Sequence, residues 1–321
     1  MNEQTVCKQL RRKFSANGWA LLIYSLIMNL AVWAVCILEV AFQLILSGDS
    51  MDFDALLTDV LLHNGWGYVL TVLVGLIGAY IWKGKAFCRR EIWRTEKIMT
   101  LPSFLGLLCV FMSAQVFFQI LSIVLELLLN LVGISIMDSM ESATMTADSF
   151  SMFLYMTLLA PVTEEIFFRG VILRSLEPYG RKFAILCSAF LFGLFHGNIV
   201  QSPYAFLVGL VLGYVTVEYS IGWAMVLHMF NNLVLGDMIT RITMELPGWV
   251  GETLTFTAIW GFAAAAIVIL VCRRKDIASY FRNGRIHPWC LKSFFQSPGV
   301  LVLTVYMTVN MLLPLIMQLF L

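Results

Sequence analysis

Two adjacent glutamates inside a long apolar stretch constrain this chain more than any other feature. Glu164 and Glu165 fall within residues 151–176, which otherwise have the composition of a membrane-spanning segment. A carboxylate in hydrocarbon is costly, so such residues face a protein interior or a water-filled cavity and mark functional sites. The stretch therefore predicts a helix inside a bundle, with its acidic side chains turned away from lipid.

The spacing around the two glutamates predicts different surroundings for each. Arg169 follows Glu165 by four residues, so the two side chains share a helix face and are expected to pair. Glu164 is rotated by about 100° from that face. A buried structural ion pair would explain Glu165 and Arg169 but would leave Glu164 without a partner. Because an unpaired buried charge needs compensation, we interpret Glu164 as a functional residue that points into a cavity.

The composition of the whole chain is that of a polytopic membrane protein. Of the 321 residues, 60% are hydrophobic and 13% are charged, which lies outside the range of soluble globular domains. The net charge of +1 gives no indication of nucleic-acid binding. The predicted fold is all-α, a transmembrane helical bundle of about eight or nine spans. The nine apolar segments are 19–46, 65–82, 101–134, 150–176, 183–197, 203–217, 223–239, 254–271 and 300–320.

The basic residues predict how these spans are oriented. If the spans alternate in direction, all of the 21 Lys and Arg residues except Arg241 fall on the side that holds the N-terminus. The positive-inside rule then predicts a multi-pass protein of the cell membrane, with a cytoplasmic N-terminus and an external C-terminus. The expected parts are three N-terminal spans in residues 1–149, a core of four helices in 150–240 that carries the polar clusters described next, and two C-terminal spans in 241–321.

Two further polar clusters interrupt the apolar segments. His196 follows Phe192 by four residues, and His228 precedes Asn232 by four. Residues with this spacing lie on one face of a helix. A single intramembrane histidine is more often a packing residue than a functional one. Two of them, each with a companion on its own face and both near the glutamate pair, indicate one shared site.

These side chains limit the possible chemistry to two alternatives. Glu164 and His196 could hold and deprotonate a water molecule, while His228 and Asn232 offer N–H donors for the oxyanion of a tetrahedral intermediate. Such a set would hydrolyse a peptide bond without a Ser or Cys nucleophile. Alternatively, Glu164, His196 and His228 would form a zinc site with one position left for water. The sequence leaves both roles open.

Taken together, the three motifs resemble a known family. EExxxR spans Glu164 to Arg169, FxxxH spans Phe192 to His196, and HxxxN spans His228 to Asn232. In this order on successive apolar segments they resemble the CPBP intramembrane proteases, the CAAX-processing and bacteriocin-processing family also called Abi or type II CAAX prenyl endopeptidases. The resemblance covers about residues 150–240.

The resemblance implies a glutamate-dependent endopeptidase embedded in the membrane, with its site open towards the cytoplasm. By position, Glu164 and His196 would activate water, and His228 and Asn232 would form the oxyanion hole. Glu165 and Arg169 would orient the site. Family members are often described as metalloproteases, so a zinc requirement stays open. The implied partners are the bilayer and a peptide or protein substrate, cleaved at a CAAX-type C-terminus or at a pheromone or bacteriocin leader; no oligomeric state is indicated.

Two other functions use the same residues. A non-catalytic membrane protein, such as an immunity factor, would bind a peptide in the same cavity. A proton-coupled transporter would use the buried Glu and His side chains as a relay, and it would be expected to show a repeat between the halves of the chain, which is not visible.

One geometric expectation conflicts with a shared site. With straight helices rising about 1.5 Å per residue, Glu164 lies about 9 Å from the cytoplasmic end if the core of its helix ends near Gly170. His196 lies about 20 Å deep by the same rule. A tilt of residues 183–197 or a bend at Pro161 is then needed to bring the two together.

Overall fold

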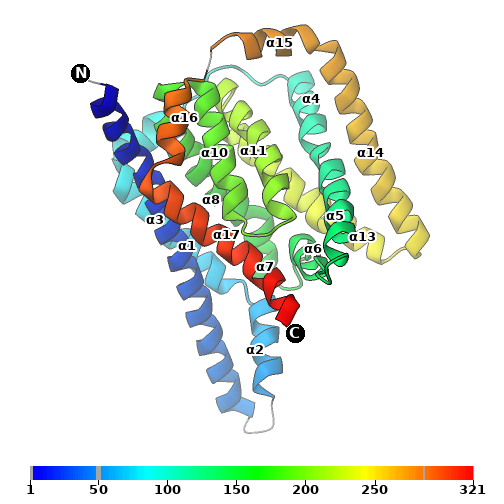
Figure 1. The fold of residues 1–321 in the computed structure, drawn as a ribbon. Helices are drawn as coiled ribbons and strands as arrows, with labels where there is room; N and C mark the ends of the chain where they lie inside the picture. The colour runs from blue at the N-terminus through cyan, green and yellow to red at the C-terminus, as the bar shows by residue number, and fades with distance from the viewer. Residues whose placement is uncertain (1–2, 48–51, 285, 321) are drawn as a thin grey trace.

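The computed structural model describes residues 3–47, 52–284 and 286–320, and in these ranges all of the regular secondary structure is helical, without a strand (Figure 1). The predicted all-α fold is therefore confirmed. The long outer helices are α1 (Glu3–Ser47), α3 (Trp66–Phe87), α4 (Leu101–Met112) continued by α5 (Ala114–Asn130), α14 (Gly248–Cys272) and α17 (Pro298–Met317). Shorter helices lie between them: α2 (Phe53–His63), α6 (Met137–Thr144), α15 (Arg274–Arg282) and α16 (Pro288–Phe295).

Among the described residues, five helices are long and apolar enough to cross a membrane. They are Lys8–Leu46, Trp66–Ile92, Leu101–Asn130, Gly248–Cys272 and Pro298–Phe320. The protein buries only 17% to 28% of the most apolar part of each, so most of their surface is free to contact lipid. The predicted number of eight or nine spans is not confirmed.

The other four predicted spans form the inside of the bundle. One is a continuous helical run made of α7 (Phe150–Leu154), a π-helical turn (Tyr155–Leu159), α8 (Ala160–Glu164), a second π-helical segment (Glu165–Leu173) and α9 (Arg174–Leu176). The others are α10 (Arg181–Phe195), α11 (Gln201–Glu218) and α12 (Ile221–Phe230), the last extended by π-helical Asn231–Ile239 and by α13 (Thr240–Met244). They are short or carry charges, so length and hydropathy alone do not identify them as spans.

The inner helices are enclosed by the outer ones. Figure 1 shows α10 and α11 in the centre, with α1 and α3 on one side and α4, α5 and α14 on the other. A β-carbon at Gly193 of α10 would lie 2.6 Å from the Ser202 carbonyl oxygen of α11, so only glycine permits this close approach. Small residues at such crossings let helices pack tightly where lipid removes the hydrophobic driving force.

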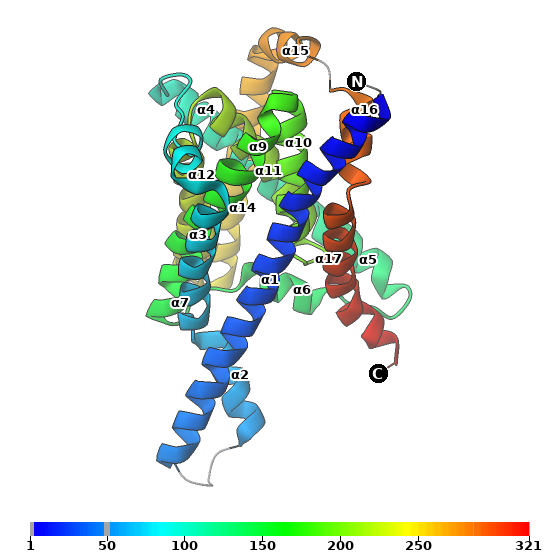
Figure 2. The ribbon, with the colours of Figure 1, turned by 90° about the vertical axis from the view of Figure 1, so that its left-hand side faces the viewer.

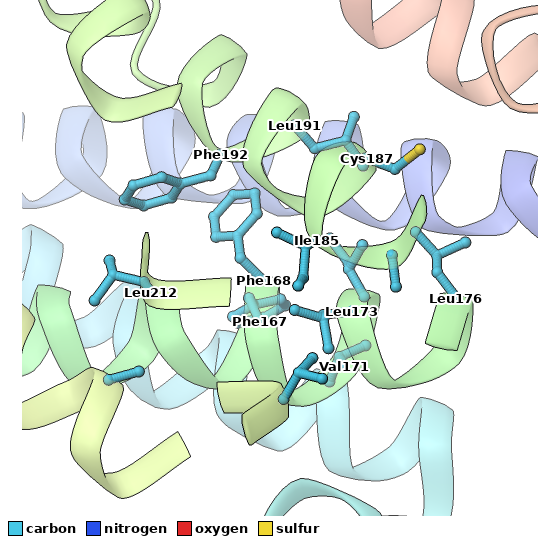
Figure 3. Close-up of a cluster of buried hydrophobic side chains, with 14 of the residues drawn as sticks. Phe167, Phe168, Val171, Leu173, Leu176, Ile185, Cys187, Leu191, Phe192 and Leu212 are labelled. Carbon is cyan, nitrogen blue, oxygen red and sulfur yellow. The ribbon is translucent and has the colours of Figure 1, made fainter. Parts of the chain in front are cut away.

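Apolar side chains, aliphatic and aromatic, fill the space between the run 150–176 and α10 (Figure 3). The rings of Phe168 and Phe192 meet edge to face, with centroids 5.2 Å apart. The Ser188 hydroxyl donates a hydrogen bond of 2.7 Å to the Phe168 carbonyl oxygen. These contacts fix the position of α10 along the run that carries the glutamates, because the interior of a protein is close-packed.

The basic segments gather at one end of the molecule. Figures 1 and 2 show the N-terminus, α15, α16 and the start of α4 at this end, which we call the basic end, and the C-terminus and α2 at the other. Arg174 is buried here; it donates to Glu177 at 3.0 Å and to the carbonyl oxygens of Arg94 and Thr216 at 3.1 Å each. This network ties the connection before α4 to the inner helices. The cytoplasmic location of the basic end stays a prediction.

Candidate active site

Glu165 is the most enclosed carboxylate of the site. Its side chain is fully buried, and its Oε1 atom accepts hydrogen bonds from Arg169 Nη1 at 3.0 Å and from His228 Nδ1 at 2.9 Å. Its Oε2 atom is buried without a partner among the described residues. Glu165 therefore joins its own helical run to α12 through one oxygen atom.

Arg169 extends this connection to two more helices. It is fully buried, donates from Nη2 to the Gly209 carbonyl oxygen of α11 at 3.3 Å, and places its guanidinium 4.1 Å from the centre of the Phe192 ring of α10. A buried ion pair of this kind is strongly destabilising to break, by about 3–5 kcal/mol, because removing one partner leaves the other charge uncompensated. The pair therefore holds the inner helices in one arrangement.

Glu164 faces a different environment. Its side chain is 27% exposed, and it lines an internal cavity of about 120 Å³ together with His196. The cavity walls also include Tyr155 from the same helical run and Tyr24 from α1. Since one water takes about 30 Å³ of liquid volume, the cavity has room for water beside the carboxylate. The structure thus brings Glu164 and His196 together.

His196 has its ring orientation fixed by its own helix. Its Nδ1 atom lies 2.8 Å from the Phe192 carbonyl oxygen. A carbonyl oxygen only accepts hydrogen bonds, so Nδ1 carries the proton, and in the neutral ring Nε2 carries the lone pair. His196 can therefore accept a proton or a hydrogen bond through Nε2.

His228 lies between the two glutamates. Besides the bond from Nδ1 to Glu165, its Nε2 atom is 3.7 Å from Glu164 Oε2. The Phe192 ring stands edge-on to both imidazoles, with centroids 4.8 Å from His196 and 5.8 Å from His228. Phe192 therefore lies between the two histidines and helps to set their separation. This packing role is a physical reason for the phenylalanine in the FxxxH motif.

Asn232 is held in place by hydrogen bonds to Met156 and Asn231. Its Nδ2 atom donates to the Met156 carbonyl oxygen at 2.9 Å, and its Oδ1 atom accepts from Asn231 Nδ2 at 3.1 Å. Within the described ranges it makes no hydrogen bond to Glu164, His196 or His228. One of its two N–H groups is thus committed to the helical run 150–176.

The sequence analysis missed this link, although Pro161 was a signal for it. In the π-helical turn the Ala160 N–H bonds to the Tyr155 carbonyl oxygen, five residues earlier. By the same five-residue pattern, the Met156 carbonyl oxygen would accept a hydrogen bond from the N–H of residue 161. Residue 161 is proline, which has no backbone N–H to donate. The Met156 carbonyl oxygen is left free of its backbone donor, and Asn232 satisfies it.

The conflict of depths expected from the sequence is resolved by the length of the helices. The helical run does not stop near Gly170 but continues to Leu176, so Glu164 lies about 18 Å from its end, not about 9 Å. His196 lies about 22 Å from Arg181, the first residue of α10. The depth of about 9 Å assumed that the apolar core of the helix ends near Gly170; the helix continues for six residues beyond Gly170, and its depth in a membrane stays a prediction.

The depth of His228 follows from where α12 begins. A β-carbon at Gly170 would lie 3.2 Å from Ile221 Cδ1, so α12 starts beside the middle of the helical run. His228 is then about 10 Å below Ile221, and Glu164 is about 9 Å below Gly170. The two side chains therefore reach the same level, and their nearest atoms lie 3.7 Å apart.

The predicted metal ligands do not form a ligand set in this arrangement. Across the described ranges, no three His, Cys, Asp or Glu side chains are grouped so that they could hold a metal ion. His228 Nε2 and Glu164 Oε2 lie 3.7 Å apart, and His196 does not complete a group of three with them. We therefore derive no step through a metal.

A helical bundle with lipid-compatible outer helices and a cavity lined by a carboxylate and an imidazole defines a membrane protein with an internal site. Within it, residues 146–234 match the family model of the type II CAAX prenyl endopeptidases described as Rce1-like, a protease family. The matched segment contains all six predicted site residues, and it confirms the resemblance. Searches of the curated proteins and of the solved structures found no match.

Proposed function

We propose that the protein is an intramembrane endopeptidase in which Glu164 and His196 activate a water molecule. The family match supports a CAAX-type protease in general terms. The observation that carries the particular assignment is the cavity that Glu164 and His196 share. His228, which contacts both glutamates, connects this cavity to the buried ion pair.

In the proposed reaction, Glu164 is the general base and then the general acid. A water in the cavity gives one proton to the Glu164 carboxylate while its oxygen bonds to the carbonyl carbon of the substrate. The second hydrogen of the water is held by His196 Nε2. Glu164 then passes its proton to the leaving amine nitrogen as the C–N bond breaks. A positioned group of this kind contributes a factor of about 10²–10⁴ to the rate.

The oxyanion of the tetrahedral intermediate is stabilised from α12 and its extension. The bond from His228 Nδ1 to Glu165 fixes its ring. Because Nδ1 already carries a proton, Nε2 can donate to the oxyanion only in the imidazolium form, in which both ring nitrogens are donors, so the proposed mechanism uses His228 in that form. Asn232 supplies the N–H that is not committed to Met156. Each well-placed donor lowers the barrier by about 3–4 kcal/mol.

The depth of the site favours an extended peptide as substrate. Glu164 lies about 18 Å from the basic end of its helix, and an extended chain advances about 3.3 Å per residue. About five or six residues are therefore needed to reach the carboxylate. A flexible C-terminal tail of the CAAX type or a leader peptide meets this requirement, and a folded domain does not.

The test is cleavage of a peptide library by the purified full-length protein, read by mass spectrometry. Glu164→Gln keeps the size of the side chain and removes the base, so cleavage is expected to fall by a factor of about 10²–10⁴. Glu141→Gln, an exposed carboxamide substitution on α6, is the matched control and is expected to leave cleavage unchanged. Cleavage that survives Glu164→Gln would overturn the proposal.

Two further arms separate the alternatives. A chelator arm decides whether a metal takes part: loss of cleavage that returns on adding zinc would replace the metal-free mechanism with a metalloprotease one. Peptide binding by the wild type without any cleavage would instead indicate a non-catalytic peptide-binding protein.

A further inference from the structure

A second cavity lies at the basic end of the bundle, outside the residues that match the family. It has a volume of about 580 Å³, and its walls include Lys8, Arg11, Arg12 and Trp19 of α1 together with Gln296 beside α16. The α1 residues recur at intervals that place them on one helix face. Figure 2 shows this part of α1 next to α16 and the start of α17. We call it the basic cavity.

The positive charges of the basic cavity have no acidic partner. Lys8, Arg11 and Arg12 take part in no ion pair with any residue of the described ranges. Arg11 donates from Nη2 to Gln296 Oε1, and its Nε atom is buried without a partner. A cavity with three cations and a buried free donor is suited to an anion that carries several acceptor oxygens.

Some other cations at the same end are neutralised within the protein. Arg94 and Arg174 pair with Glu177, and Lys97 pairs with Glu218. The acidic groups at this end thus pair with cations nearer the inner helices, and within the described residues they leave the three cations of the basic cavity, like the exposed Arg89 and Arg90, without an ion pair.

The wall of the basic cavity is built by a tight helix crossing. The Ser15 hydroxyl accepts a hydrogen bond of 2.7 Å from the Gly299 N–H, which joins α1 to the start of α17. A β-carbon at Gly18 or at Gly299 would overlap the opposite backbone. The two helices are thus fixed against each other just below the three cations, so the cavity does not depend on flexible side chains alone.

Apolar surface continues from the basic cavity in one direction. Trp19 stands at its edge, and Ile23, Leu301 and Val302 beyond it are exposed on α1 and α17. Tryptophan is typical of the boundary between the headgroups and the hydrocarbon. We propose that the basic cavity binds the phosphate of an anionic phospholipid headgroup, whose acyl chains lie along the exposed faces of α1 and α17.

Lipid retention by the full-length protein tests this proposal. The protein is exchanged into detergent with either phosphatidylglycerol or phosphatidylcholine, and native mass spectrometry counts the bound lipids and gives their dissociation constants. We expect one tightly bound phosphatidylglycerol and no comparable phosphatidylcholine. Arg11→Gln with Arg12→Gln is expected to weaken that binding by about tenfold or more, because each basic residue near an anionic lipid contributes separately.

The matched control removes the same charge elsewhere. Arg89 and Arg90 are exposed on the π-helical segment Cys88–Ile92 at the same end, so Arg89→Gln with Arg90→Gln should change the binding less than twofold. Equal weakening in both double variants would overturn the proposal, since binding would then follow only the overall charge. Lys8→Gln, a single change of an exposed side chain, repeats the test if the double variant folds poorly.

A last arm distinguishes the lipid from a free anion. Inorganic phosphate at millimolar concentration shares the headgroup chemistry but lacks acyl chains. If it displaces phosphatidylglycerol completely, the cavity binds free phosphate, and the lipid assignment is wrong. None of these measurements depends on peptide cleavage, so their outcome is independent of the proposed protease function.

Discussion

Phe192 shows how a single apolar side chain organises the polar groups of the site. It lies against the guanidinium of Arg169 and stands edge-on to both His196 and His228. The face of its ring carries partial negative charge, which attracts the guanidinium, and near-perpendicular ring pairs are a favoured aromatic arrangement. The residue does no chemistry, yet it sets the distance between the two imidazoles.

Phe192→Leu is expected to lower cleavage while the protein still folds. The substitution keeps an apolar side chain but loses the cation–π contact with Arg169, worth about 2 kcal/mol when desolvated, and the spacing of the histidines. Phe190→Leu on the same helix removes a ring that contacts Phe295 away from the site. Turnover and thermal unfolding of both variants should show a loss of activity specific to Phe192; equal activity would contradict this role.

The two glutamates are expected to differ when each is changed to glutamine. Glu165→Gln removes the negative charge that compensates Arg169 in a fully buried position, so the free energy of unfolding should fall by about 3–5 kcal/mol. Glu164, which is partly exposed to a cavity, should lose activity with a much smaller loss of stability. Denaturant unfolding in detergent compares the two. A larger destabilisation by Glu164→Gln would contradict the assigned environments.

The different surroundings of Glu164 and Glu165 could be predicted in part from the sequence. The four-residue spacing predicted the pairing of Glu165 with Arg169, which the structure shows at 3.0 Å. It could not reveal that His228 shares the same carboxylate oxygen, because that contact joins helices that are far apart in the chain.

At the scale of elements, the helical run 150–176 departs from regular α-helix geometry, and these departures position a side chain of the site. The π-helical turn and Pro161 together release one backbone carbonyl, that of Met156, towards Asn232. Single π-helical turns inside α-helices often occur at functional sites. Here the turn explains how an amide on one helix is oriented by the backbone of another.

Pro161→Ala tests this mechanism. The substitution restores an N–H that can bond to the Met156 carbonyl oxygen in competition with Asn232. Because a hydrogen bond contributes about 0.5–1.5 kcal/mol, turnover should fall by about two- to tenfold, with unchanged or increased stability. Pro314→Ala, inside α17, restores a helical N–H away from the site and serves as the control. Unchanged turnover in Pro161→Ala would show that Asn232 needs no such orientation.

At the scale of the whole molecule, the outer helices complete a site that the matched segment does not build alone. Tyr24 and Met28 of α1 and Val72 of α3 form part of the wall around Glu164 and His196. The cavity is therefore built from two of the three predicted parts of the chain, the N-terminal helices and the core.

The segregation of basic residues predicts which end faces the cytoplasm, and cysteine labelling can test it. Arg282 on α15 and Glu245 after α13 are both exposed, and Figure 1 places α15 at the basic end and α13 away from it. A membrane-impermeant maleimide should label Glu245→Cys in intact cells and Arg282→Cys only in inverted vesicles. The reverse pattern would show that the basic end lies outside.

The sequence by itself determined the all-helical class, the family resemblance, the pairing of Glu165 with Arg169 and the unusual position of Glu164. These follow from composition and from side chains one helical turn apart, which local geometry controls. Only the tertiary structure decided that Glu164 and His196 share a cavity, that α1 helps to enclose it, and that Met156 holds Asn232. Such contacts depend on where each helix begins and ends and on how closely separate helices pack. A local sequence pattern determines neither.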